Sequence, residues 1–80
     1  MRQDIKDGIE RYVEFGVPTG SFLQAVLEND LMEAMGRADD DNRNDIFEIC
    51  SYIYNETPSP CHGSPEKVKQ WKSHNGMQGV

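Results

Sequence analysis

Apolar residues recur at helical spacing along this chain, and the first such stretch predicts a helix over residues 3–15. Gly16 follows it, at a position where a left-handed residue commonly ends a helix, and Pro18 prevents its continuation. We therefore expect this helix to end near Phe15. Its apolar face consists of Ile5, Ile9, Tyr12 and Val13.

The most apolar stretch follows the tight turn PTGSF at residues 18–22 and predicts a central helix that ends at Gly36. Thr19 and Ser21 are both suitable N-caps, and Gly20 supplies the backbone freedom that a tight entry needs. The apolar face is wider than one partner helix requires, so we expect this helix to lie at the centre of the fold. The face consists of Phe22, Leu23, Val26, Leu27, Leu31, Ala34 and Met35.

A third helix is predicted over about 42–55, after the acidic run ADDDNRND at residues 38–45. Asp39 or Asp41 is expected to cap it, because acidic side chains complement the positive end of a helix dipole. The second and third helices are expected to form an antiparallel hairpin. The apolar face of the third helix consists of Ile46, Phe47, Ile49, Cys50, Ile53 and Tyr54.

Pro58 and Pro60 predict an extended loop at residues 56–63, ETPSPCHG. A short fourth helix follows with a clear start signal, Ser64 as N-cap and Pro65 at its first position. Val68 and Trp71 are expected to dock it on the other helices.

The pattern as a whole predicts an all-α fold, a compact bundle of three main helices plus a short C-terminal helix. Residues 1–74 form its single domain, and the non-periodic residues 75–80 form a flexible tail. A chain of 80 residues buries only about 60% of the surface that its unfolded form exposes, and self-association is a common remedy. A homo-oligomer, either a dimer or a tetramer, is therefore expected.

The formal net charge of −6 is unevenly distributed. Residues 1–62 carry thirteen acidic and five basic side chains, whereas residues 63–80 carry one acidic and three basic side chains. An acidic body argues against duplex nucleic acid as a partner, because duplex binding needs Lys or Arg to neutralise phosphates. The acidic body does not exclude a small anionic ligand that binds in a local pocket.

The chain has neither an apolar run long enough to span a membrane nor the apolar core of a signal peptide near its start. We therefore expect a cytosolic protein without a membrane partner. Two cysteines are too few for a disulfide scaffold, and both are expected to be thiols. Cys50 lies on the apolar face of the third helix, whereas Cys61 lies in the loop, where a thiol can be reactive.

Catalytic and metal-binding patterns are weak. His62 and His74 are not spaced from cysteines or acids as a metal site requires, and the acidic run lacks the Gly and Glu of a calcium loop. A nucleophile and base pair at Cys61 and His62 is disfavoured, because adjacent residues rarely orient correctly. Walker, nucleophile-elbow and dinucleotide motifs are absent. We therefore expect neither an enzyme nor a bound metal or cofactor.

Two helix starts, at residues 18–22 and 62–66, offer backbone N–H donors and the positive end of a helix dipole. Both features suit a phosphate, although capping alone explains the same residues. Tyr52 and Arg11 point away from the predicted apolar faces and are candidate ligand residues. Asn55, at the end of the third helix, either caps that helix or contacts a base edge.

The segments RYVEFGVPTGSFLQAVLENDLMEAMGRADDDN and SYIYNETPSPCHGSPEKVKQW resemble a group of small bacteriophage-encoded proteins. The resemblance covers about residues 9–71, and PTGSF, ENDL, YNE and GSPEKV carry it. The group is similar to phage immune-evasion proteins that act as nucleotide sponges, of the anti-CBASS kind. Those are compact helical oligomers that sequester cyclic dinucleotide signals of bacterial antiphage defence without cleaving them.

The resemblance implies capture of a cyclic oligonucleotide, most simply a cyclic dinucleotide, at subunit interfaces in the cytoplasm of the host bacterium. Two alternatives stay open, an acidic anti-CRISPR-like inhibitor that imitates nucleic acid toward a basic host protein and a structural phage component. The acidic inhibitor would use Glu33, Asp39, Asp40, Asp41 and Asp45. The ligand residues expected for capture are Arg11, Tyr12, Pro18, Thr19, Gly20, Ser21, Phe22, Tyr54, Asn55 and Ser64.

Overall fold

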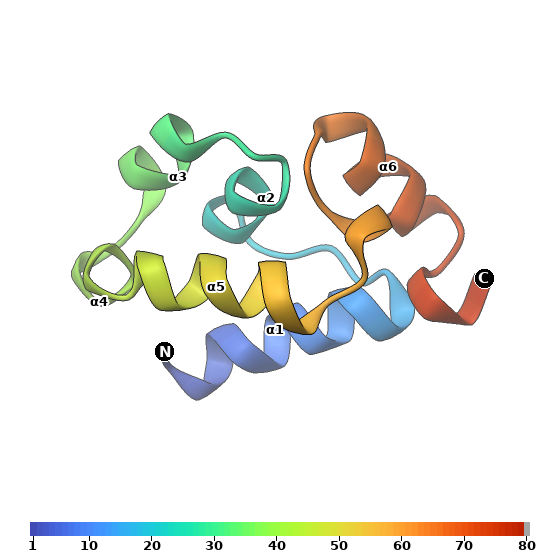
Figure 1. Ribbon diagram of the computed structural model, residues 1–80, viewed down its shortest axis with the longest axis horizontal. Helices are drawn as coiled ribbons and strands as arrows, with labels where there is room; N and C mark the ends of the chain where they lie inside the picture. The colour runs from blue at the N-terminus through green and yellow to red at the C-terminus, as the bar shows by residue number, and fades with distance from the viewer. Residues whose placement is uncertain (80) are drawn as a thin grey trace.

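Six α-helices and two short 3-10 helices make up the part of the chain described by the structure, a computed structural model covering residues 1–79 (Figure 1). This range contains no β-strand, so the predicted all-α class is confirmed. The helices are more numerous and shorter than the four expected. In chain order they are α1 (Gln3–Phe15), α2 (Ser21–Leu27), α3 (Leu31–Arg37), α4 (Asp40–Asn44), α5 (Ile46–Glu56), η1 (Ser59–Cys61), α6 (Pro65–Ser73) and η2 (Gly76–Gly79).

The first helix, α1, has the bounds that the sequence predicts. Gly16 adopts a left-handed conformation with φ +71°, and its N–H donates to the Tyr12 carbonyl oxygen at 2.8 Å. This hydrogen bond closes the last turn of the helix. Ile5, Ile9 and Tyr12 of the predicted apolar face are buried.

The prediction of one central helix ending at Gly36 is wrong, because two short helices, α2 and α3, take its place. Asn29 interrupts the segment in a left-handed conformation with φ +64°, which Asn tolerates better than most residues. Asp30 then caps α3, since its carboxylate accepts a hydrogen bond from the Glu33 N–H at 3.3 Å. As a result α2 and α3 pack against each other.

The N-cap predicted for the same segment is also wrong. Gly20 is the N-cap of α2, in an extended conformation, and it has no side chain to donate or accept a hydrogen bond. The Thr19 hydroxyl donates instead to the Gly20 carbonyl oxygen at 3.2 Å, and Ser21 is already the first helical residue. The PTGSF turn therefore starts a short helix without a hydroxyl cap.

The third predicted helix is likewise divided, into α4 and α5. Asp39, one of the two predicted caps, accepts a hydrogen bond from the Asn42 N–H at 2.8 Å. Asp45 has φ −98° and ψ +7°, in the bridge region between helical and extended conformations, and it turns the chain from α4 into α5. Four short helices, α2 to α5, therefore replace the expected hairpin of two long ones.

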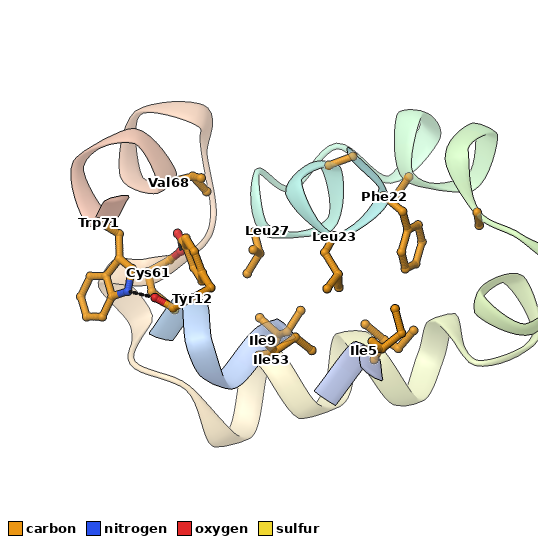
Figure 2. Close-up of a cluster of buried hydrophobic side chains, with 14 residues drawn as sticks. Ile5, Ile9, Tyr12, Phe22, Leu23, Leu27, Ile53, Cys61, Val68 and Trp71 are labelled. Carbon is orange, nitrogen blue, oxygen red and sulfur yellow. Dashed lines mark hydrogen bonds between the residues drawn. The ribbon is translucent and has the colours of Figure 1, made fainter. Parts of the chain in front are cut away.

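The hydrophobic core lies between α2 on one side and α1 and α5 on the other, and α6 closes one end (Figures 1 and 2). At that end the Tyr12 hydroxyl donates to the Cys61 carbonyl oxygen at 2.6 Å. The indole N–H of Trp71 donates to the Tyr12 carbonyl oxygen at 3.1 Å. These two bonds join α6 and the loop before it to α1. The apolar side chains that meet between the helices include Ile9, Leu23, Leu27 and Ile53.

Residues 75–79, which were expected to belong to a flexible tail, include η2, and η2 packs against α1. Gly76 is buried in this contact with φ +64°. A Cβ atom on Gly76 would lie 2.6 Å from the backbone nitrogen of Gly16, so only glycine fits. Val80, the last residue of the predicted tail, lies outside the described residues.

Candidate functional site

A pocket of about 380 Å³ opens between α5, the end of α2 and the loop that follows η1. We call it the α5 pocket. Its volume falls at the lower end of the range of small-molecule sites, about 300–1,000 Å³. The lining residues are Val26, Asn29, Phe47, Cys50, Ser51, Ile53, Tyr54, Asn55, His62 and Gly63.

Helix α5 supplies most of the residues that line the pocket. Phe47, Cys50, Ser51 and Tyr54 follow one another at steps of three, one and three residues, which places them on the same helix face. Phe47 is 84% exposed and Tyr54 is 78% exposed. Two large aromatic side chains thus flank the pocket while remaining open to solvent.

The sequence assigned both aromatic residues to the core, and this assignment is wrong. Ile49 and Ile53, four residues apart, form the buried face of α5 and are 0% and 4% exposed. The apolar face of this helix is broad, and a molecule of this size covers only its middle. Phe47 and Tyr54 lie at its uncovered edge.

The loop after η1 forms the opposite side of the pocket and is fixed by its backbone. The Gly63 N–H donates to the Leu27 carbonyl oxygen at 2.7 Å, which ties the loop to the end of α2. Gly63 has φ +121°, a conformation that strains any residue with a side chain. Its neighbour His62 lines the pocket from this fixed segment.

His62 is half-buried, and its Nε2 atom is enclosed by the protein without a hydrogen-bond partner. Burial lowers the pKa of His62 below its ordinary value, and the nearby Lys67 ammonium lowers it further. Both effects favour the neutral imidazole over the imidazolium. Buried polar atoms without a partner are rare in folded proteins, so His62 Nε2 is an exception to the usual pairing of such atoms.

Two carboxamides add neutral hydrogen-bonding groups. The Asn55 side chain donates one N–H to the Ser51 carbonyl oxygen at 2.9 Å, which holds the amide in place. The left-handed conformation of Asn29 sets the second carboxamide at the opposite side, between α2 and α3. No carboxylate is among the residues that line the pocket.

A positive charge lies next to the pocket. A Cβ atom on Gly63 would be 3.5 Å from the Lys67 Nζ, so the ammonium group lies beside this lining residue. Ser64 caps α6 at the same place, since its hydroxyl accepts a hydrogen bond from the Lys67 N–H at 3.2 Å. The loop side of the pocket is therefore its more cationic side.

The structure brings two of the ten predicted ligand residues, Tyr54 and Asn55, into the α5 pocket. Ser64 directly follows the lining residue Gly63 and lies at the start of α6. Tyr12 and Phe22 are in the hydrophobic core, with 1% and 7% of their surface exposed. Burial raises the pKa of the Tyr12 hydroxyl, which donates its hydrogen bond to the Cys61 carbonyl oxygen inside the protein.

The remaining predicted ligand residues lie elsewhere. Arg11 lines a shallow hollow of about 300 Å³ on α1, together with acidic residues and Phe15. The PTGSF turn connects α1 to α2, and none of its residues lines the α5 pocket. The residues of this turn are Pro18, Thr19, Gly20, Ser21 and Phe22.

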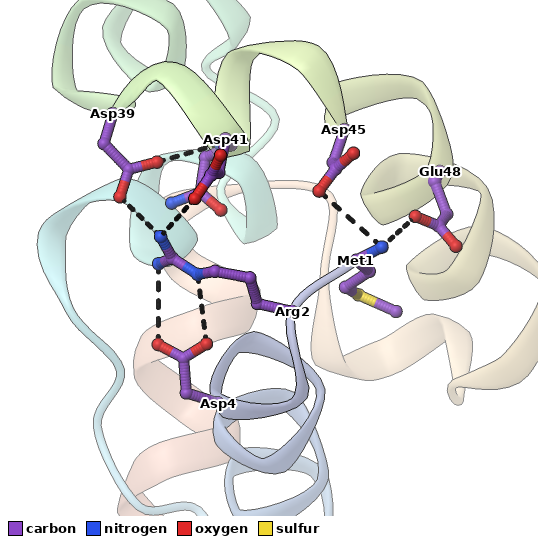
Figure 3. Close-up of polar contacts among 8 residues, drawn as sticks. Met1, Arg2, Asp4, Asp39, Asp41, Asp45 and Glu48 are labelled. Carbon is purple, nitrogen blue, oxygen red and sulfur yellow. Dashed lines mark hydrogen bonds and ion pairs between the residues drawn. The ribbon is translucent and has the colours of Figure 1, made fainter.

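The acidic residues named for the alternative inhibitor take part in ion pairs within the chain, and Figure 3 shows those of Asp39, Asp41 and Asp45. The Arg2 guanidinium lies 2.8 Å from the Asp39 carboxylate and 3.4 Å from that of Asp41. The hydrogen bond from the Asn42 N–H lowers the pKa of the Asp39 carboxylate, and the hydrogen bond from Arg2 lowers it further. The other pairs are Arg43 with Asp40, Arg37 with Glu33, and the Met1 ammonium with Asp45.

Cys61 is fully buried, so its position in a loop does not expose the thiol to reagents. Its sulfur lies 3.5 Å from the Thr57 hydroxyl oxygen, and burial raises the pKa of the thiol. Cys50 is half-buried in the pocket lining, and burial raises its pKa as well. Both side chains are free thiols.

Asn29, Phe47 and His62 are lining residues that the sequence did not single out as ligand residues. The Asn-Asp pair at 29–30 was a signal for the helix break, because both side chains compete with helical hydrogen bonds. Nothing in the local pattern shows that this break meets α5 and the loop after η1, since that contact joins distant parts of the chain.

Residues 1–79 contain no helix long and apolar enough to cross a membrane. Within the same range, no three His, Cys, Asp or Glu side chains lie close enough together to hold a metal ion. No protein-family model, curated protein or solved structure matches this chain.

Proposed function

We propose that this chain is a bacteriophage anti-defence protein that captures a cyclic oligonucleotide, most simply a cyclic dinucleotide, in the α5 pocket. The observation that carries the proposal is the pair of exposed aromatic side chains, Phe47 and Tyr54, that flank a largely apolar pocket without a carboxylate in its lining. Stacking of bases on exposed aromatic rings is a recurrent basis of nucleotide binding. The phage origin and the role in defence come from the resemblance of the sequence motifs.

The spacing of the aromatic residues suits a ligand with two bases. Phe47 and Tyr54 are seven positions apart on α5, which corresponds to a rise of about 10.5 Å along the helix axis. Stacked bases repeat at about 3.4 Å, so two bases between two rings require three such intervals. The span along α5 is close to that requirement.

The polar groups suit the remaining parts of such a ligand. Carboxamides bond to the edges of bases, as Asn29 and Asn55 are placed to do. The Lys67 ammonium beside Gly63 provides a charge for phosphate at the loop side. Capture of an intact signal needs these binding groups and no reacting residue.

Self-association is part of the proposal. Leu31, Met32 and Met35 of α3 are 56%, 84% and 38% exposed, which is an apolar surface that a second copy would cover. Sedimentation equilibrium at about 100 µM protein is expected to give a dimer or tetramer, at a concentration within the range of weak protein association. A monomer at this concentration would contradict that part of the proposal.

Native mass spectrometry tests the proposed function on the full chain. Protein purified from cells that make cyclic dinucleotides is expected to retain one ligand per pocket, with a mass equal to that of the uncleaved molecule. Linear or hydrolysed nucleotides in place of the intact ligand would contradict capture without cleavage. A bare protein that also fails to bind added cyclic dinucleotides and trinucleotides would overturn the proposed function.

A further inference from the structure

We infer that the side chain of Asn29 contacts the ligand in the α5 pocket and that its carboxamide selects adenine over guanine as the bound base. This inference rests on the proposed function and names the base that the ligand carries. The starting observation is that Asn29 lines the pocket, is exposed, and has φ +64°, a conformation that glycine adopts more readily. Because the residue is exposed, a ligand reaches its side chain without a rearrangement of the core.

The end of α2 fixes the position from which the Asn29 side chain extends. The Asn29 N–H donates to the Val26 carbonyl oxygen at 3.0 Å, and the Asp30 N–H donates to the Ala25 carbonyl oxygen at 2.9 Å. These two hydrogen bonds form a Schellman motif, in which the left-handed residue is usually glycine. Val26 of the same motif also lines the pocket, so the motif holds the Asn29 backbone at the pocket wall.

The fold alone does not require a side chain at position 29. Glycine makes the same two backbone hydrogen bonds and adopts the left-handed conformation without the steric cost that Asn carries. Asn29 thus departs from the residue that suits the motif best, at a place where the chain borders the pocket. Such departures concentrate at functional sites, and here the added group is a carboxamide.

The hydrogen-bonding groups around the pocket favour adenine over guanine. A carboxamide carries a donor beside an acceptor, which matches the N6 amino group and the N7 acceptor of adenine. Guanine presents adjacent acceptors at O6 and N7, which Arg or Lys matches, and adjacent donors at N1 and N2, which a carboxylate matches. The described residues that line the pocket include no Arg, Lys, Asp or Glu.

Asn29 is the more suitable of the two lining carboxamides. The amide of Asn55 is already held by the Ser51 carbonyl oxygen at 2.9 Å, so its orientation is set by α5. The Lys67 ammonium lies beside Gly63 at the loop side of the pocket, where the phosphate is expected. The base therefore faces Asn29 at the opposite side, and the phosphate faces the cationic loop.

Asn75 provides a matched control, because its backbone has the same φ of +64° and it is also exposed. It precedes η2 and lines none of the described pockets. Glycine at either position keeps the left-handed conformation, so Asn29→Gly and Asn75→Gly are both expected to melt no lower than the wild type by circular dichroism. Calorimetry then measures the affinities of cyclic diadenylate and cyclic diguanylate for all three proteins.

The wild type is expected to bind cyclic diadenylate at least about tenfold more tightly than cyclic diguanylate, within the range that one bidentate contact to a base gives. Asn29→Gly is expected to reduce this preference to within about twofold, because that contact is lost, and Asn75→Gly to leave it unchanged. A wild type that binds cyclic diguanylate equally or more tightly, or a preference that survives in Asn29→Gly, would overturn the inference and leave capture itself intact. A wild type that binds neither ligand would overturn the proposed function and the inference with it.

An isosteric substitution separates the hydrogen-bonding pattern of the side chain from its shape. Asp also tolerates the left-handed conformation, but its carboxylate only accepts hydrogen bonds and matches the N1 and N2 donors of guanine. Asn29→Asp is therefore expected to lower the ratio of the two affinities, cyclic diadenylate over cyclic diguanylate, at least about tenfold. An unchanged ratio in this variant would show that the carboxamide does not select the base, and the inference would be overturned.

Discussion

At the scale of single residues, burial and hydrogen bonding distinguish Tyr12 from Tyr54, although the two side chains are chemically identical. Tyr12 is enclosed, and its hydroxyl joins α1 to the loop before α6 through the Cys61 carbonyl. Tyr54 is 78% exposed and lines the α5 pocket. The first is a structural residue, and the second is a candidate ligand contact.

Replacing Tyr12 by Phe is expected to lower the free energy of unfolding by roughly 1–3 kcal/mol, because the buried Cys61 carbonyl loses its donor. The same change at Tyr54 is the matched control and is expected to stay within about 0.5 kcal/mol. Urea unfolding followed by circular dichroism measures both. Equal effects of the two substitutions would contradict the distinction between them.

His62 gives the stability a pH dependence with a defined sign. Its pKa in the folded protein is lowered from the ordinary value of 6.5, so the unfolded chain takes up this proton first as the pH falls. The stabilising contribution is therefore complete above about pH 6.5 and is lost as the pH drops through the folded-state pKa.

Unfolding measured at pH 7 and pH 5 tests this sign. The wild type is expected to lose more stability over this interval than His62→Gln, which does not titrate there. Acidic residues such as Asp39 also titrate, but they are the same in both proteins and cancel in the comparison. A larger loss in the variant would show that the sign is wrong.

At the scale of elements, the sequence predicts helix starts and ends well where one side chain or one glycine decides them. Gly16 ends α1, and Ser64 begins α6, as expected. The breaks at Asn29 and Asp45 were missed, because apolar residues at helical spacing continue after each polar stretch and the position of each turn depends on how the short helices pack. Helical periodicity indicates which apolar residues share one face of a helix, but it does not indicate where the helix ends and the chain turns.

The glycines of η2 and α3 provide a test at this scale. Gly76→Ala is expected to lower the free energy of unfolding by roughly 1–3 kcal/mol from the positive φ alone, and the contact with Gly16 adds to this. Gly36→Ala is expected to raise it by about 0.5–1 kcal/mol, because α3 has open space there and Ala favours helix.

Thermal melting of the two variants measures these opposite shifts. A shift of 1 kcal/mol corresponds to about 4–8 °C in Tm for a domain of this size. If Gly76→Ala melts at the same temperature as the wild type, this result would contradict the packing of η2 on α1. It would agree instead with the flexible tail expected over residues 75–80.

At the scale of the whole molecule, the all-α class was predictable because helical periodicity covers most of the chain. The α5 pocket was not, since it forms where α2, α5 and the loop after η1 meet. Two of its residues, Tyr54 and Asn55, were named in advance, although Tyr54 was also assigned to the core. The distribution of charge over the surface adds a second way to separate the functional candidates.

Charge reversal on the acidic side distinguishes nucleotide capture from the acidic inhibitor. Asp40→Lys is the least disruptive choice, because its side chain is 92% exposed and Asp40 does not cap a helix. Capture in the α5 pocket predicts a ligand affinity within about twofold of the wild type, since Asp40 does not line the pocket and salt solution screens an exposed charge. Binding to a basic host protein would instead fall sharply.

Calorimetric titration of cyclic dinucleotides into the wild type, Tyr54→Ala and Met77→Ala tests the central claim most directly. Met77 is 44% exposed on η2 and lines none of the described pockets, so its variant is the matched control. Tyr54→Ala is expected to weaken binding roughly 5- to 150-fold, the loss of one stacking contact of about 1–3 kcal/mol, and Met77→Ala to leave it unchanged. No heat from the wild type at tens of micromolar protein, or equal affinities of all three proteins, would contradict capture in the α5 pocket.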